Sequence, residues 1–349
     1  MNSTVSLKHF LTPTWLLIVV GLVVGGAVGL YEIFVGHSFA TNSALVWTLP
    51  LVTYIYLALM STGVSIIIAY GLLARKSAIL ERMRALLIVA IGLLMGAFTA
   101  LATELGSILN MVWILLSPNP LSPIWWMGAL YSVELVLLIV KLVMDLMGRH
   151  GPLDRPLAWA TLAVASAAAM MIGAVFGTVI GRADYVGMYT SLFTLPVALL
   201  AGVAVVILTQ PQGRMTEMLT TAYRQLAVLW IILLGLKLFY DAHSSVQALQ
   251  GWVDIWTILA FVLIALFAGL APRVLAALGL VAALWVAYNF VITGQLVSLG
   301  PTASWFGEIQ AYRPNWPELA VFVLGIAVAA ALIKLGYQYL LPDRGPAAT

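Results

Sequence analysis

Long apolar runs follow one another through almost the whole chain, and this pattern most constrains its fold. Ten runs are expected to form helices, because about 20 consecutive apolar residues span the hydrocarbon core of a bilayer. Charged residues make up only 8% of the 349 residues, against about 25% in soluble domains. We therefore expect an all-α, polytopic integral membrane protein. The expected helices cover residues 14–34, 45–73, 85–113, 124–147, 157–180, 187–209, 219–240, 252–271, 274–293 and 317–341.

The order of the helices predicts a single membrane domain over residues 1–349. After the first helix over 14–34, we expect one four-helix bundle over 45–180, a second over 187–293, and a last helix over 317–341. A Thr-Leu-Pro triplet occurs near the start of the second and the sixth helix, which is a weak sign of an internal repeat. No small-residue cleavage site follows the first apolar run, so we interpret it as a retained helix and not as a signal peptide.

Basic residues are concentrated in alternate loops. Short loops rich in Lys and Arg stay in the cytoplasm, so this pattern predicts a prokaryotic cytoplasmic membrane with both termini on the cytoplasmic side. The sequence pI near 9.1 then reflects topology and not a nucleic-acid partner. In the loops of the opposite, outer side, the only basic residues are Arg182 and Arg313. The cytoplasmic set comprises Lys8, Arg75, Lys76, Arg82, Arg84, Arg149, Arg155, Arg214, Arg273 and Arg344.

The chain contains no cysteine, which excludes disulfides, thiolate metal sites and cysteine-ligated iron–sulfur clusters. A membrane haem needs axial histidines inside the bundle, and no histidine is expected there. Any redox centre would therefore come from another subunit. The four histidines, at expected helix ends or in loops, are His9, His37, His150 and His243.

The stretch from residue 104 to 145 holds the most distinctive polar residues. Its prolines predict a tight, non-helical turn over 117–123, and the paired Trp125 and Trp126 after it suit a membrane interface. Glu104 is expected in the outer third of the 85–113 helix, with Asn110 two turns further out. An intramembrane ion costs about 2.5–3.5 kcal/mol, so Glu104 is a candidate catalytic group that exchanges protons. The alternative is a buried acid that packs against a neighbouring helix.

Glu134, Lys141 and Asp145 follow on the next helix. Spacings of seven and four place the three side chains close to one helical face. They fit either one half of a proton path or a simple ion pair between Lys141 and Asp145 near the inner interface.

Two motifs resemble the membrane subunit family of polysulfide reductase, called NrfD-like. The first comprises Leu115, Leu116, Pro118, Pro120, Ser122 and Pro123, followed by Trp126 and Gly128. The second, Tyr-Arg-Pro-Asn-Trp-Pro-Glu-Leu over 312–319, is similar to the segment that opens the last helix of ten-helix members. The resemblance covers roughly residues 47–341.

The resemblance implies a quinone-reactive membrane anchor without haem. It would exchange electrons between a menaquinone or ubiquinone pool and a docked ferredoxin-like iron–sulfur subunit. That subunit would in turn serve a molybdopterin enzyme, a hydrogenase or a multihaem cytochrome. Two positions depart from the family pattern, since Val46 and Trp47 stand where some relatives have His, and Ser107 where many have Arg. The residues expected near the quinone are Trp47, Asn110, Arg182, Asp184, Tyr189 and His37.

Other interpretations remain. Arg182 and Asp184 could equally dock a partner, and His37 could be an ordinary surface histidine. The whole chain could be a secondary transporter that uses Glu134, Lys141 and Asp145 as its relay. However, no glycine- or proline-broken segments occur at matching midplane positions of the two halves. A passive anchor is the third possibility.

Overall fold

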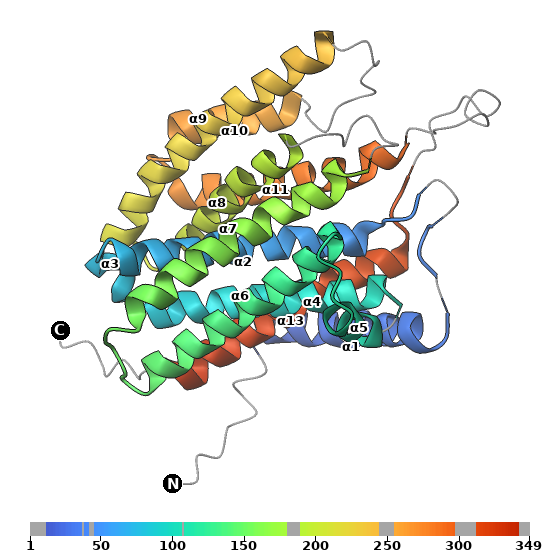
Figure 1. The fold of residues 1–349 in the computed structure, drawn as a ribbon. Helices are drawn as coiled ribbons and strands as arrows, with labels where there is room; N and C mark the ends of the chain where they lie inside the picture. The colour runs from blue at the N-terminus through green and yellow to red at the C-terminus, as the bar shows by residue number, and fades with distance from the viewer. Residues whose placement is uncertain are drawn as a thin grey trace.

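A computed structural model of the chain describes residues 12–36, 38–41, 45–106, 108–179, 189–243, 255–296 and 312–341. Within these ranges the chain forms helices joined by turns, without a strand, and the long helices run side by side (Figure 1). Nine described helices are long and apolar enough to cross a membrane, and α10 is a shorter apolar helix. The expected all-α polytopic membrane architecture is therefore confirmed. The helices are α1 (Pro13–Phe34), α2 (Leu49–Leu73), α3 (Ser77–Leu80), α4 (Met83–Glu104), α5 (Ile108–Leu116), α6 (Pro123–Leu146), α7 (Asp154–Gly177), α8 (Tyr189–Thr209), α9 (Arg214–His243), α10 (Ile255–Phe267), α11 (Pro272–Leu296) and α13 (Trp316–Leu340).

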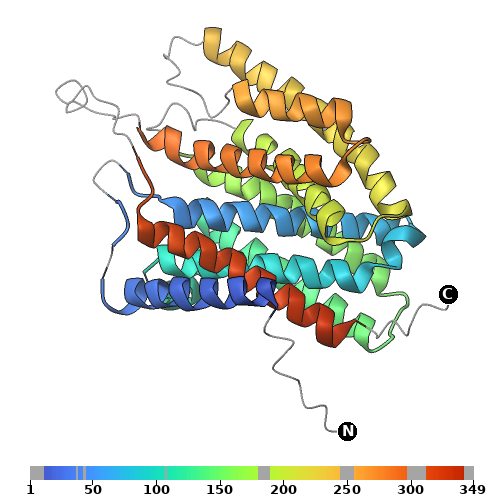
Figure 2. The ribbon, with the colours of Figure 1, turned by 180° about the vertical axis from the view of Figure 1, so that it is seen from behind.

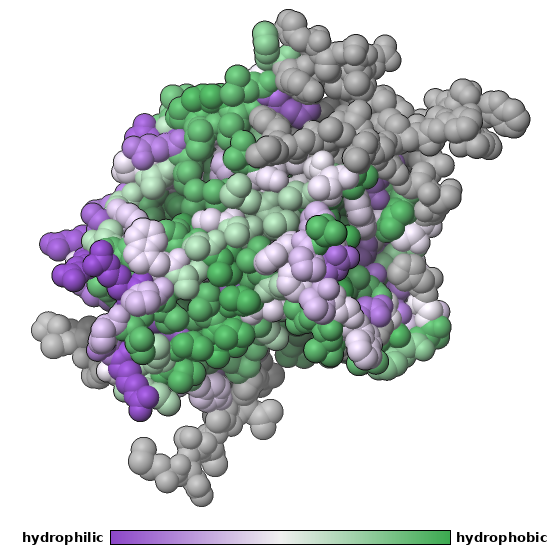
Figure 3. Space-filling view, viewed as in Figure 1, coloured by the Kyte–Doolittle hydropathy of each residue, from purple (hydrophilic) through white to green (hydrophobic). Residues whose placement is uncertain are grey.

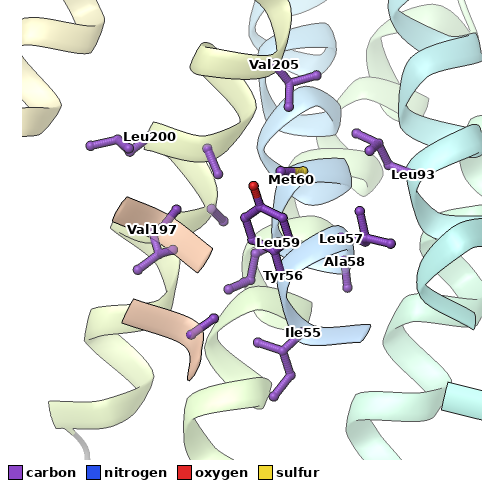
Figure 4. Packing of buried hydrophobic residues seen from close by; sticks show 14 of the residues in the cluster. Ile55, Tyr56, Leu57, Ala58, Leu59, Met60, Leu93, Val197, Leu200 and Val205 are labelled. Atoms are coloured by element: carbon purple, nitrogen blue, oxygen red, sulfur yellow. The ribbon is translucent and has the colours of Figure 1, made fainter. Parts of the chain in front are cut away.

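Helix α2 lies at the centre of the molecule. Its most apolar stretch is 94% buried, whereas that of α1 is only 28% buried. Figure 4 shows side chains of α2, among them Ile55 and Met60, between Val197 and Leu200 on one side and Leu93 of α4 on the other. A helix that is apolar all round and buried all round must contact other helices on every side. Helix α2 therefore connects the two halves of the chain.

Two glycines allow α2 and α8 to approach closely. A Cβ atom on Gly63 would lie 1.9 Å from the Ala198 carbonyl oxygen, and one on Gly202 would lie 2.3 Å from the Gly63 carbonyl carbon. Any larger residue at either position would force the helix backbones apart, because small residues let membrane helices pack closely.

The remaining helices surround α2 in an ordered way. Helices α2, α4, α6 and α7 contact one another in a ring, and so do α8, α9, α10 and α11. Helices α2, α7, α8 and α11 join the two rings. Helices α1 and α13 lie side by side, and α13 packs against α4 (Figure 2).

The predicted helix over 85–113 is wrong, because the chain forms two helices there. Helix α4 ends at Glu104, and α5 begins at Ile108. Between them Gly106 has a φ of +64°, a left-handed conformation that glycine adopts without a steric penalty and that ends helices. The proline turn before α6 is non-helical as predicted, and the Ser122 side chain accepts a hydrogen bond from the Trp125 amide, which caps α6.

The hydrophilic surface gathers mainly at one end of the helices. Figure 3 shows this end beside a broad apolar band, and Figure 1 places α3 there. We call it the basic end, because helix ends and connections that carry basic residues lie there: Arg75, Arg84, Arg149, Arg214 and Arg273. The start of α2 and the proline turn before α6 lie at the opposite end.

Candidate functional site

Side chains from several elements meet at the start of α2, at the opposite end. The Glu104 carboxylate accepts hydrogen bonds from the Thr48 amide at 3.0 Å and the Thr48 hydroxyl at 2.9 Å. The Gln295 side-chain oxygen accepts from the Val46 amide at 2.9 Å and the Trp47 amide at 2.8 Å. These three amides belong to the residues directly before α2, so the Glu104 and Gln295 side chains hold the chain where the helix begins. We call this group, with the residues below, the entry network.

A tyrosine and a second carboxylate complete the entry network. The Tyr312 hydroxyl accepts a hydrogen bond from the Leu49 amide at 2.9 Å and donates one to Glu318. Glu318 is fully buried and also accepts from the Ala40 amide at 2.7 Å. Burial, together with the bond to Glu318, raises the pKa of Tyr312, so the phenol stays a donor at neutral pH. The last helix, α13, is thereby joined to the start of α2.

A second polar centre lies inside the first ring of helices. Glu134 of α6 is fully buried and accepts hydrogen bonds from two hydroxyls of α2, Ser65 at 2.7 Å and Thr62 at 3.1 Å. The rings of Tyr54 and Tyr131 meet edge to face with centroids 6.0 Å apart. Both tyrosines interact electrostatically with Glu134. The Tyr54 hydroxyl is buried, and no group in the described part of the chain bonds to it.

A cavity adjoins this second centre. It has a volume of about 280 Å³ and lies between α2, α4, α5 and α6. Its walls are apolar apart from a few groups, and they include Tyr54, Phe98, Met111, Leu115 and Ser132. We call it the Tyr54 groove. Tyr54 belongs to its lining, and the buried Tyr54 hydroxyl bonds to no group of the described residues, so the groove suits a molecule that brings a hydrogen-bond acceptor and apolar substituents.

Charged pairs continue from Glu134 toward the basic end. Lys141, only 3% exposed, pairs with Asp154 of α7, and Asp145 pairs with Arg84 of α4 at 2.6 Å. Lys141 and Asp145 do not pair with each other, because these neighbouring helices supply closer partners. A void of about 10 Å³, close to the volume that one water needs, is lined by Lys141 and Thr161.

A larger groove of about 760 Å³ runs between α10, α11 and α13. Its walls are almost wholly apolar and include Trp256, Trp285, Tyr288 and Phe322. The Tyr288 ring lies 6.1 Å from the ring of Tyr312, so the groove reaches the entry network. We call it the Tyr288 groove.

No protein-family model matches the chain, and no curated protein is significantly similar to it. The geometry of the two polar centres and of the grooves is therefore what supports a function.

Among the residues expected near a quinone, the structure describes the side chains of Trp47 and Asn110, and their surroundings differ. Trp47 packs edge to face on Phe176 at 4.9 Å and does not line the Tyr54 groove. Asn110 lies on α5, exposed, and its amide donates to the Leu105 carbonyl at 2.9 Å, which caps the end of α4. Glu104 is the last residue of α4 and not an interior residue of a longer helix. Tyr189 begins α8, with its side chain outside the described residues, and Arg182, Asp184 and His37 also lie outside them.

For several residues of both centres, the sequence did not indicate the contacts that the structure shows. Gln295 and Tyr312 act on the start of α2 from about 250 residues away in sequence, which local patterns do not reveal. Ser61, Thr62 and Ser65 did carry a signal, since hydroxyls at helical spacing inside an apolar helix indicate a polar face. Glu318 lies in the first turn of α13, where an acid complements the helix dipole, and the structure adds its contacts with Tyr312 and Ala40.

Proposed function

We propose that this multi-span membrane protein is the quinone-reactive anchor of a respiratory oxidoreductase, and that the quinone ring binds in the Tyr54 groove. The Tyr54 hydroxyl carries the proposal. A buried donor without a partner costs about 1–3 kcal/mol, so a ligand that supplies an acceptor is favoured there. A quinone supplies a carbonyl oxygen at the edge of a flat apolar ring, and its isoprenoid tail would extend from the groove into the lipid.

Quinone chemistry also requires a route for protons. Oxidation of a quinol releases two electrons and two protons, and reduction of a quinone takes up the same numbers. The buried carboxyl of Glu134 lies beside Tyr54 and Tyr131 and is held by two hydroxyls, so it is suited to accept or supply a proton. Lys141 and Asp154 would continue this route toward the basic end.

A second subunit has to carry the electrons, because no redox group is assigned to this chain. In the proposal they pass to a docked ferredoxin-like iron–sulfur subunit at the opposite end, and from there to a catalytic redox subunit. The proposal places the protein in a prokaryotic cytoplasmic membrane with the basic end in the cytoplasm, in accord with the distribution of basic loops. Glu104 is kept as a second proton-exchange group, at the entry network.

The test is the binding of a quinol-analogue inhibitor to the complex purified from its native membranes. Tyr54→Phe removes one hydroxyl and no volume, and we expect about tenfold weaker binding, the effect of one hydrogen bond to a ligand. Tyr288→Phe makes the same change in the Tyr288 groove and serves as the matched control. Weaker binding only in the control variant would move the ring to the Tyr288 groove. Unchanged binding in both, or no binding to the wild type, contradicts the quinone proposal.

An ion-translocating transporter is the second candidate, and the buried Glu134 and Lys141 favour it. A transporter would move its substrate with the purified chain alone in liposomes, without a redox partner. A quinone-reactive anchor requires the partner for turnover. Uptake by the isolated chain, combined with no inhibitor binding, would select the transporter.

A further inference from the structure

A third groove, at the basic end, differs from the other two. It has a volume of about 440 Å³ and lies where the connection between α8 and α9 meets the connection between α10 and α11. Polar side chains form much of its wall, among them Thr216, Thr221, Arg224 and Arg273. We call it the Arg224 groove. None of its lining residues belongs to the entry network or to the Tyr54 groove, so its function is separate from quinone binding.

Two arginines provide the positive charge of the Arg224 groove. The Nε group of Arg224 donates to the Ala265 carbonyl at 2.8 Å, and an Nη2 group of Arg273 donates to the Gln210 carbonyl at 3.3 Å. Each bond uses one of the five N–H donors of a guanidinium. No carboxylate of the described residues pairs with either arginine, and this includes Glu217 in the same wall. The arginines are thus held in place by carbonyls while most of their donors stay free.

Smaller groups around the arginines favour the same kind of ligand. The Thr216 hydroxyl bonds to the Gly213 amide and carbonyl, both at 2.9 Å, which orders the wall at the start of α9. Helices α9 and α11 both begin beside the groove, at Arg214 and Pro272, and helix starts carry partial positive charge. Together with two guanidinium groups, these features favour a phosphate group, which binds several donors at once.

The surface beside the groove is apolar and exposed. Leu270 in the groove wall is 83% exposed, the neighbouring Val274 is 69% exposed, and Leu266 of α10 is 60% exposed. In a membrane protein such residues contact acyl chains. A free phosphate ion would gain nothing from them, whereas a phospholipid places its phosphate at the membrane interface and its acyl chains beside them.

We propose that the Arg224 groove binds the phosphate headgroup of an anionic phospholipid, with the acyl chains along the exposed apolar residues of α10, α11 and the connection between them. Arg224 and Arg273 bind the phosphate oxygens, and the lipid links the two connections that form the groove. The alternative is that both arginines only cap carbonyls and mark the cytoplasmic side.

The experiment measures lipid binding to the full chain in detergent, by native mass spectrometry and by the shift in thermal unfolding. Three probes are titrated separately: phosphatidylglycerol, phosphatidylcholine and inorganic phosphate. We expect phosphatidylglycerol to bind and to raise the unfolding temperature, with much weaker effects from the other two. In the Arg224→Gln/Arg273→Gln variant, binding of phosphatidylglycerol should weaken about tenfold or more.

Matched controls make the result decisive. Arg149→Gln/Arg155→Gln removes two exposed arginines of the basic end that lie outside the groove, and its lipid binding should equal that of the wild type. Arg224→Lys keeps the charge but loses the planar fork, so we expect it to bind phosphatidylglycerol with intermediate strength. This variant supplies the test if the double variant fails to fold. Equal binding of phosphatidylglycerol and phosphatidylcholine, or an equal loss in both double variants, overturns the proposal. An equal effect of inorganic phosphate would show a site for a soluble anion and overturn the lipid assignment.

Discussion

At the scale of single residues, the buried polar side chains act mainly on other elements than their own. Glu104 ends α4 but accepts from the amide and the hydroxyl of Thr48, the residue directly before α2. Tyr312 precedes α13 but accepts from Leu49 of α2. Removing the acceptor of a buried donor leaves that donor unsatisfied, so both residues contribute to stability whatever their chemical role is.

Replacing Glu104 separates its structural role from its chemical role. Glu104→Ala removes both acceptors of Thr48, and we expect a loss of about 1–3 kcal/mol in the free energy of unfolding. Glu104→Gln keeps one acceptor oxygen, so its free energy of unfolding should fall clearly less. Thermal unfolding in detergent checks both variants. If the Gln variant is as stable as the wild type and turns over quinol normally, Glu104 is a cap and not a proton carrier.

Glu134 is expected to behave differently from Glu104. Glu134→Gln keeps the shape of the side chain and can still accept from Ser65 or Thr62, so the protein should fold. It cannot release a proton, and we expect the rate of quinol turnover in the complex to fall about tenfold or more, the range of general acid–base effects. Stopped-flow or steady-state quinol oxidation gives the measurement. Ser132→Ala, in the wall of the Tyr54 groove, is the control that changes the groove without removing a titratable group.

At the scale of elements, buried charge pairs and close glycine contacts join the helices. Lys141 and Asp154 connect α6 to α7 where Lys141 is almost fully buried. Gly63 and Gly202 set the approach of α2 to α8. Neither contact is made between neighbours in sequence, and both depend on the facing helix.

Removing one partner of the Lys141–Asp154 pair should lower the free energy of unfolding much more than removing both partners. Asp154→Leu leaves Lys141, which is only 3% exposed, without its anion, and we expect a loss of about 3–5 kcal/mol in the free energy of unfolding, which is typical when one partner of a buried pair is removed. In Lys141→Met/Asp154→Leu neither charge is left, so much of the stability should return. A double-mutant cycle of unfolding measurements tests this. Equal losses in the single and double variants would show that the pair contributes little.

Gly63→Ala tests the contact between α2 and α8. A methyl group there meets the Ala198 carbonyl, so we expect poor assembly and a lower unfolding temperature. Gly26→Ala is the matched control, because a Cβ atom at Gly26 meets nothing within 4 Å. If both variants unfold at the same temperature as the wild type, the close approach of α2 and α8 is not required.

At the scale of the whole molecule, the helices separate a basic end from an end that holds the entry network and the proline turn. This asymmetry is the basis for the orientation proposed here. It also places the Arg224 groove at one end of the bundle and the entry network at the other.

The absence of cysteine makes the orientation directly testable. Single cysteines introduced at Arg149 and at Asn119 lie at opposite ends of α6 and are exposed. We expect an impermeant thiol reagent added to intact cells to label Asn119→Cys and not Arg149→Cys, because the basic end faces the cytoplasm. Permeabilised cells should show labelling of both. The reverse pattern in intact cells would invert the topology.

Some features of this protein follow from the sequence by itself. Apolar runs long enough to span a bilayer determine a helical membrane protein, since only helices satisfy every backbone group within one segment. Pro118 and Pro120 determine the non-helical turn before α6, because each removes a backbone donor and disfavours a helical conformation of the residue before it. The sequence does not show that a glycine adopts the left-handed conformation, as Gly106 does. The apolar pattern therefore predicts one helix where the structure has α4 and α5.

The tertiary structure alone decided which polar groups meet. Lys141 could pair with Asp145 four residues away, yet Asp154 of α7 and Arg84 of α4 are the partners observed. Gln295 and Tyr312 reach the start of α2, and the Tyr54 groove forms between four helices. Inside a membrane almost every helix face is apolar, so the apolar pattern does not indicate which faces pack together. Small residues and hydrogen bonds between distant helices decide the packing, and they act only once those helices are adjacent.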